Sequence, residues 1–458
     1  MPASTTDWDV ERRARVRPRS PAGPGTHAAV LVITAVALLL PLMMGNRTPL
    51  TLTASQLVLV SGALLAGILA TLPLRGTLPP PDRVWLAFGG VFTFYALLQV
   101  LPSTALASAF GPYPEALWNH PDFAPRHWSP DIGATLRGWV AFVALFTLAW
   151  VAHGMRSSQR NVLWLALAAM AVFQAIYGVT AHAAGAETIF GIWPRNTPHA
   201  VHGSFSNYNL FAAYLALLWP LSVAVWWIRE MPLLHRLPRE IKFAGSLLTS
   251  VVIGAALFAS TSRLGSGAAV VGAVVALLLW SRHRHLLYGA SVWPAYLAFG
   301  AGLLAATWYG LAPLVERLLA TGTHDMRFEV LTLVRAEVPL SWYLHGVGLG
   351  GFEAMFKQIQ PGHLAFWVDY AHSDVLQWLV EMGLVGVILL LVVIAGLIRA
   401  AHLSIERIAL YAGLAALVLV SLGDFSWHIP ATQAVLAVFL GTLLRGRPRR
   451  SRSSGSGP

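Results

Sequence analysis

Residues 373–398 have the sequence SDVLQWLVEMGLVGVILLLVVIAGLI. No charged residue follows Glu381 until Arg399, and a helix needs about 20 mostly apolar residues to cross a bilayer. The segment therefore predicts a membrane-spanning helix that carries one carboxyl group, that of Glu381, well inside the span, besides Asp374 at its start. An ionisable group at that depth usually faces a cavity or a partner, so Glu381 is a candidate site residue. The simpler interpretation is a packing hydrogen bond to a neighbouring span.

The same apolar pattern recurs along the chain. Of its 458 residues, 56% are hydrophobic and 11% are charged. Soluble domains have roughly a quarter charged residues, so this composition excludes an ordinary soluble enzyme, and its apolar content excludes disorder over most of the length. We predict an all-α polytopic membrane protein with about twelve transmembrane helices in a membrane domain over 27–445. The predicted spans are 27–45, 55–74, 84–101, 133–153, 162–182, 207–228, 242–260, 264–281, 286–312, 373–398, 405–423 and 428–445.

Basic residues predict the orientation, because Lys and Arg collect on the cytoplasmic side. With the N-terminus inside, most of the 31 basic residues fall in inside segments, whereas most of the 20 acidic residues fall outside or within spans. The Arg-, Pro-, Ser- and Gly-rich tails, 1–26 and 446–458, are then disordered cytoplasmic segments. This distribution explains the net charge of +11 by basic residues at the cytoplasmic membrane surface. We therefore expect no nucleic-acid partner.

The absence of cysteine excludes disulfides, iron–sulfur clusters, thiolate nucleophiles and Cys-type zinc sites. His199 and His202 have i,i+3 spacing, but the sequence shows no third ligand beside them. We therefore expect neither a metal site nor a cofactor.

Three predicted outer loops are longer than a turn: 102–132, 183–206 and 313–372. In the last loop, residues 325–335 have the pattern of an amphipathic helix lying on the membrane surface, which Pro339 would end. The segment 346–352 then matches G-x-G-x-x-G, but a dinucleotide site needs a βαβ unit around that motif. We interpret it as a tight turn that brings backbone close to a ligand or a helix.

Two further residues stand at predicted outer positions. His372 lies where the chain re-enters the bilayer, and Arg263 lies in the short turn Thr261-Ser262-Arg263-Leu264-Gly265. Each has an ordinary explanation, as an interfacial anchor or as a side chain reaching the lipid headgroups. Because this side otherwise has few basic residues, Arg263 is also a candidate for binding an anion such as phosphate.

These residues, taken in order, resemble a known family, the O-antigen ligase and O-antigen polymerase superfamily of bacterial envelopes. The resemblance covers about residues 200–430. Its elements are Ser204 to Leu215 with the Asn207-Tyr208-Asn209 segment, Thr261-Ser262-Arg263, Arg327 followed by Pro339 and the 346–352 turn, His372 to Gly386, and Asp424-Phe425. The family often has Asn after the histidine, and here Ser373 stands in that place.

The resemblance implies a GT-C-like membrane glycosyltransferase whose large periplasmic loop carries short helices. The donor would be a glycan on undecaprenyl or another polyprenyl pyrophosphate, and the enzyme would lie in the bacterial inner membrane with both termini cytoplasmic. An O-antigen ligase would use lipid A-core as acceptor; the alternatives are an O-antigen or exopolysaccharide polymerase, with a glycan acceptor, and a protein O-oligosaccharyltransferase. In this scheme Arg263 and Arg327 stabilise the departing pyrophosphate without a metal, and His372 is the general base of an inverting transfer.

Other residues are weaker candidates for substrate binding: Arg195, Asn207, Asn209, Ser373 and Glu381. The two asparagines fit packing between helices equally well. Aromatic residues of the loop, such as Trp342, Phe352 and Phe356, fit either sugar stacking or an interfacial belt.

A transporter or flippase is the alternative from a different class. Transporters often contain inverted repeats and helices broken at the middle of the bilayer. The sequence shows no internal repeat, and the candidate residues fall in outer segments, so we favour the enzyme.

Overall fold

The computed structural model describes residues 24–43, 49–72, 78, 81, 83–102, 127–195, 197, 199–282, 297, 300, 326–364 and 368–446. The predicted span 286–312, apart from residues 297 and 300, and almost all of the two predicted tails lie outside this part of the chain. The loop 313–372 is described from residue 326 onward, except for 365–367.

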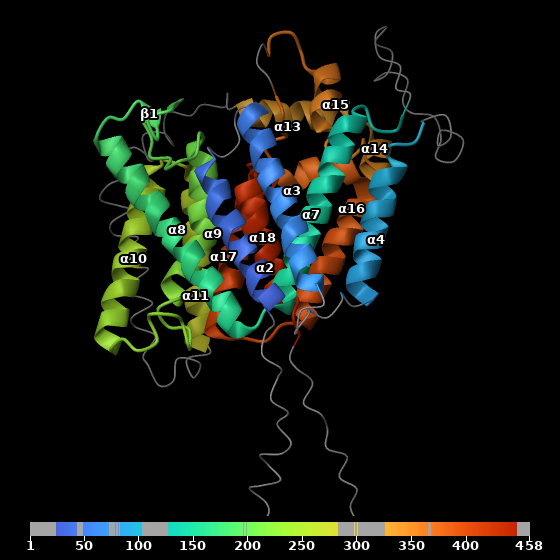
Figure 1. Cartoon of the computed structure of the whole chain (residues 1–458). Helices are drawn as coiled ribbons and strands as arrows, with labels where there is room; N and C mark the ends of the chain where they lie inside the picture. Colours follow the sequence, from blue (N-terminus) through green and yellow to red (C-terminus); the bar gives the residue numbers. More distant parts are fainter. Residues whose placement is uncertain are drawn as a thin grey trace, which may run out of the picture.

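The described chain is a bundle of helices (Figure 1). The long helices are α2 (Pro24–Leu39), α3 (Pro49–Thr71), α4 (Arg83–Leu98), α7 (Ile132–Gly154), α8 (Ser157–Ala183), α9 (Tyr208–Ala224), α10 (Arg239–Ala259), α11 (Arg263–Arg282), α16 (Asp374–Arg399), α17 (Ile405–Ser421) and α18 (Pro430–Leu443). The only strands in the described residues are β1 (Thr188–Ile189) and β2 (Trp193–Pro194), which form a small hairpin. Each long helix coincides with a predicted span, which confirms the all-α prediction, and the predicted break at Ser262-Arg263 separates α10 from α11.

The outer surface of the bundle is apolar. Large hydrophobic side chains point away from the protein on several helices; Leu57, Phe94, Leu248 and Leu278 are each more than 60% exposed. In water such a surface is costly, whereas lipid tails cover it at no cost. Seven described helices are long and apolar enough to cross a membrane: Gly25–Leu42, Leu50–Thr71, Ile132–Gly154, Ser157–Ala183, Arg239–Ala259, Arg263–Arg282 and Asp374–Arg399. The chain is therefore a membrane-embedded helical protein.

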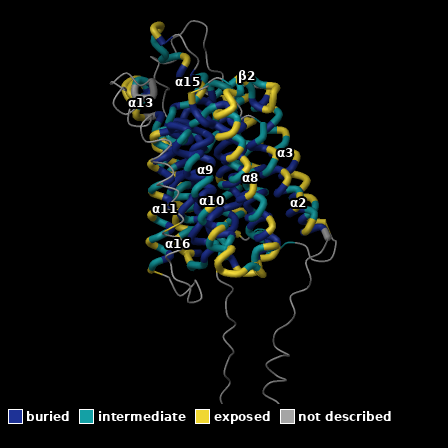
Figure 2. Tube along the Cα trace, turned by 90° about the vertical axis from the view of Figure 1, so that its left-hand side faces the viewer, coloured by how far each residue is buried: buried dark blue, intermediate teal, exposed yellow. Residues whose placement is uncertain are grey.

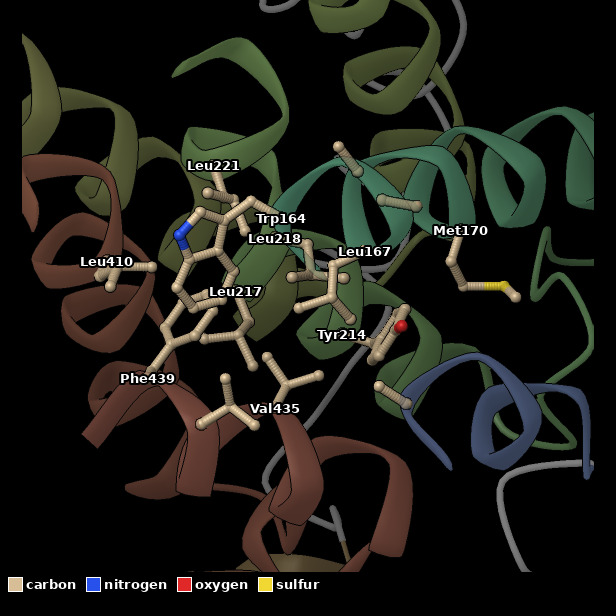
Figure 3. Close-up of a cluster of buried hydrophobic side chains, with 14 of the residues drawn as sticks. Trp164, Leu167, Met170, Tyr214, Leu217, Leu218, Leu221, Leu410, Val435 and Phe439 are labelled. Carbon is tan, nitrogen blue, oxygen red and sulfur yellow. The ribbon is translucent and has the colours of Figure 1, made fainter. Parts of the chain in front are cut away.

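Helix α9 forms the centre of the bundle, and its residues from Asn209 to Ala224 are all buried. Figure 2 shows it in dark blue, whereas outer helices such as α3 and α8 carry exposed residues. A helix that is apolar on every side belongs in such an interior. Figure 3 shows side chains of α8, α9, α17 and α18 packed together, with the Trp164 and Phe439 rings edge to face at 5.7 Å.

The helix ends form two groups. At one end, the Arg407 guanidinium donates to the Thr442 carbonyl at 3.1 Å, and the Arg160 Nε lies 2.7 Å from the Glu406 Oε1. Arg445 also bonds to the Met155 carbonyl there. We call this the basic end. Its described basic residues include Arg156, Arg160, Arg229, Arg236, Arg239, Lys242, Arg399, Arg407 and Arg445. The predicted membrane orientation requires basic residues to gather at one end of the bundle in this way.

The opposite end carries a cap of three short helices from residues 326–372 (Figure 1). They are α13 (Met326–Glu337), α14 (Leu340–His345) and α15 (Phe352–Ile359). Helix α13 ends directly before Val338 and Pro339, as predicted, because the proline ring cannot continue a helix. We call this end of the bundle the cap end.

Candidate functional site

The cap has a hydrophobic core of its own. Val330 and Val334 of α13 are fully buried in it, together with Trp342, Phe352 and Phe356. The prediction that this helix lies on the membrane surface is therefore wrong, since its apolar face packs on α15 and the rest of the cap. Sugar stacking by the three aromatic residues is excluded in this conformation, because they are at most 2% exposed.

The glycine-rich turn 346–351 packs against a break in helix α16. Gly383 has a φ of 57° inside that helix, and a Cβ on Gly346 would collide with the Glu381 carbonyl. Gly346, Gly348 and Gly350 also have positive φ, which only glycine adopts without strain. The structure thus confirms a tight turn that brings backbone close to a helix.

Glu381 anchors this turn. Its Oε2 accepts the Gly350 N–H at 2.8 Å and its Oε1 accepts the Phe352 N–H at 3.4 Å. Gln377, one helical turn earlier, donates from Nε2 to the same Oε1 at 3.0 Å. Glu381 is only 1% exposed, so these three hydrogen bonds satisfy a buried carboxyl group. The partner of Glu381 is the cap backbone and not a neighbouring span.

Replacing Glu381 with glutamine should loosen the turn. The new amide nitrogen cannot accept from Gly350 or Phe352, and an unsatisfied buried N–H costs about 2 kcal/mol. We expect protease cleavage within 346–351 of the purified protein to become roughly 30-fold faster, as such a cost implies. The matched control is Glu353→Gln, because Glu353 forms an exposed ion pair with Lys357. Equal cleavage of the two variants would contradict the anchoring role.

A buried carboxyl–imidazole pair lies where α16 begins. Asp374 Oδ1 is 2.7 Å from His428 Nδ1, and Asp374 Oδ2 accepts the Trp427 N–H at 2.9 Å. Asp374 is fully buried, whereas the His428 side chain is 24% exposed. Burial lowers the pKa of His428, but the hydrogen bond to Asp374 and the nearby carboxylate charges outweigh it, so this pKa is raised overall. The pair favours an imidazolium held against a carboxylate.

His372 belongs to an aromatic cluster beside this pair. Its ring meets Phe425 edge to face at 5.3 Å, and Phe425 stacks on Tyr370 at 4.5 Å. Tyr370 in turn lies 5.3 Å from the His428 ring. His372 has a φ of 52°, a backbone conformation that is uncommon outside glycine and concentrated at functional sites. The cluster therefore connects the His372 and His428 rings through Phe425 and Tyr370 at the cap end.

Arg263 reaches the same region from α11. It is the exposed first residue of that helix, and Thr261 just before it has a φ of 57°, which is a true outlier for a β-branched residue. The next residue, Leu264, lies against Gly423, only two positions before Phe425. The start of α11 and His372 therefore both lie next to the segment 423–425, α11 through Leu264 and His372 through Phe425.

Arg195 lies on the hairpin side of the cap end. Its Nε donates to His202 Nε2 at 2.9 Å, and its Nη1 donates to the Ala186 carbonyl at 3.3 Å. Burial, followed by the Arg195 charge, lowers the pKa of His202 to about 4, so this ring is a neutral acceptor. His202 is thus bound to an arginine. Within the described part of the chain, no group of three or more His, Asp or Glu residues is arranged to hold a metal ion.

The remaining candidates, apart from Arg327, have structural partners. Asn207 caps α9 by accepting the Asn209 N–H at 2.7 Å, and Asn209 Oδ1 accepts the Ser262 hydroxyl at 2.8 Å. Ser373 caps α16 through the Leu376 N–H at 3.3 Å. Arg327 is the second residue of α13, within the cap. The two asparagines and Ser373 thus shape the turns that present Arg263 and His372.

The residues that sequence reasoning missed are Asp374 and His428. They are 54 positions apart, and no spacing rule connects them. The available signal was Asp374 itself, an acidic residue directly at the mouth of a predicted span.

No protein-family model matches the chain, and no curated protein matches it.

Proposed function

We propose that the protein is a membrane glycosyltransferase that moves a glycan from a polyprenyl pyrophosphate, such as undecaprenyl pyrophosphate, to an acceptor hydroxyl, as an O-antigen ligase does. The observation that carries the proposal is that Leu264, the residue next to Arg263, lies against Gly423, while His372 lies against Phe425 at the same end of the bundle. Arg263 and His372 are the two residue types that the reaction needs, an anion-binding guanidinium and a base. They come from distant parts of the chain and lie beside strained backbone.

The chemistry divides between the charged groups. As the glycosyl–pyrophosphate bond breaks, negative charge grows on the leaving group, and this proposal assigns its stabilisation to Arg263 and Arg327. His372 takes the proton from the acceptor hydroxyl, whose oxygen attacks the anomeric carbon from the opposite face. The expected product therefore has the inverted configuration. In this proposal α2–α18 belong to a GT-C-like frame of twelve spans, with the cap in the periplasm.

An O-antigen polymerase and a protein O-oligosaccharyltransferase would use the same donor and the same groups, and would differ in the acceptor. A transporter would need its buried acid free to change partners. Glu381, however, binds two backbone N–H groups of the cap and one glutamine, which favours the enzyme.

The test is reconstitution of the purified full chain in vesicles with a glycan on undecaprenyl pyrophosphate. Lipid A-core, a second lipid-linked glycan and a serine-containing peptide are offered separately as acceptors, with and without EDTA. We expect EDTA-resistant transfer to lipid A-core, with inversion seen by NMR. Transfer to one of the other acceptors would assign the corresponding alternative. Movement of the donor across the bilayer without transfer would support a transporter and refute the proposal.

A further inference from the structure

A cavity of about 390 Å³ lies between helices α4, α7, α16 and α18. Its wall is largely apolar and includes several aromatic rings: the Phe92 and Phe142 rings stack at 3.5 Å, and the Phe146 ring lies 6.0 Å from that of Phe142. This volume is at the small end of the range for sites that hold a single small ligand. It suits one hydrocarbon chain.

The cavity has two different ends. Towards the basic end it is lined by Trp85 and Leu444, and Trp85 lies against His153 in the last turn of α7. Towards the cap end it is lined by Glu381, Trp427 and His428. The cavity thus runs along the bundle. Its lining is apolar towards the basic end and includes ionisable side chains towards the cap end.

The residues at the cap end of the cavity determine which polar group a bound hydrocarbon chain can carry there, a phosphate or a hydroxyl. His428 is held by Asp374, and the charges of Glu381 and Asp369 also act on it. Among the residues that line the cavity there is no arginine or lysine, and its one imidazole, that of His428, is already paired with Asp374, so a phosphate finds no unpaired cation there. A hydroxyl group fits both partners, since it can accept from the His428 ring and donate to a Glu381 carboxyl oxygen.

We propose that this cavity binds a long-chain alcohol, with the hydrocarbon chain between α4, α7, α16 and α18 and the uncharged hydroxyl at His428 and Glu381. The pyrophosphate of the donor discussed above would bind elsewhere, at Arg263. The site does not depend on glycan transfer, because binding requires only the cavity and its polar end.

The experiment uses the full chain in phosphatidylcholine vesicles and hexadecanol that carries a photoreactive diazirine in its chain. After illumination, adducts are mapped by mass spectrometry. We expect adducts on the cavity-lining residues of α4, α7, α16 and α18. The phosphate monoester of the same chain should label these residues at least tenfold less.

Matched variants test the location. Ala141→Trp fills the cavity from α7 and should reduce labelling at least tenfold, and Ala437→Phe on α18 should act in the same way. Val143→Trp is the control, because Val143 lies on the same helix, is 38% exposed and does not line the cavity. Equal labelling in the filled variants, equal labelling by the phosphate, or adducts spread over exposed helices such as α3 would each overturn the proposal. None of these readouts requires transferase activity, so a failure here is distinguishable from a failure of the proposed function.

Discussion

Replacing Arg263 with alanine should lower the rate of glycan transfer by about 100- to 1,000-fold, as the loss of one fixed group that stabilises developing charge does. Arg263 is the first residue of α11, and the turn before it is held by the hydrogen bond from the Ser262 hydroxyl to Asn209 Oδ1 at 2.8 Å. A fixed cation needs no reorganisation when the leaving group becomes charged. Arg263→Lys should recover only part of the rate, because lysine lacks the planar fork that binds phosphate through two hydrogen bonds.

The matched control is Arg335→Ala. Arg335 is an exposed arginine in the last turn of α13, so its removal changes the charge of the cap end equally. We expect the control to keep at least half of the wild-type initial rate in the vesicle assay. If Arg263→Ala also keeps half, or if the two variants lose activity equally, Arg263 does not bind the leaving group.

The helices were predictable because the bilayer sets both the length and the composition of a membrane-spanning helix. A span has to be about 20 residues long and apolar, so α7 and α16 coincide with predicted spans to within one residue at each end. The break before Arg263 was also visible as polar residues between two apolar runs. The identity of α9 as the central helix was not visible, since in lipid a central helix and a peripheral helix are equally apolar.

The site was predictable only residue by residue. The sequence marks Arg263, His372 and Glu381 because polar groups are costly beside apolar spans. It does not show that Glu381 holds the cap turn, since that depends on where the 346–351 backbone packs. The pairing of Asp374 with His428 is equally invisible, because it depends on how α16 packs beside the α17–α18 connection. The apolar stripe of α13 predicted an amphipathic helix correctly, but a stripe does not reveal whether lipid or protein covers it.

Replacing His372 with alanine should lower the rate of transfer by about 100- to 10,000-fold, which is the usual contribution of a general base. Because the base acts on the acceptor proton in the transition state, kcat should fall while the KM for the lipid-linked donor stays nearly constant. His372→Asn should be equally inactive, although it keeps a planar polar side chain beside Phe425. Initial rates at saturating donor and acceptor measure the effect.

Variants of two other histidines, His363 and His428, test whether the loss of activity belongs to His372 alone. His363→Ala is the control, because His363 is 69% exposed and paired with Glu329 at 2.6 Å on the cap surface, and this variant should be fully active. His428→Ala asks whether the second imidazole of the cluster is the base instead. Its ring is already held by Asp374 and favours the protonated form, which suits a hydrogen-bond donor and not a proton acceptor. Loss of kcat in His428→Ala, with full activity in His372→Ala, would therefore reverse the assignment and give the proton transfer to the Asp374–His428 pair.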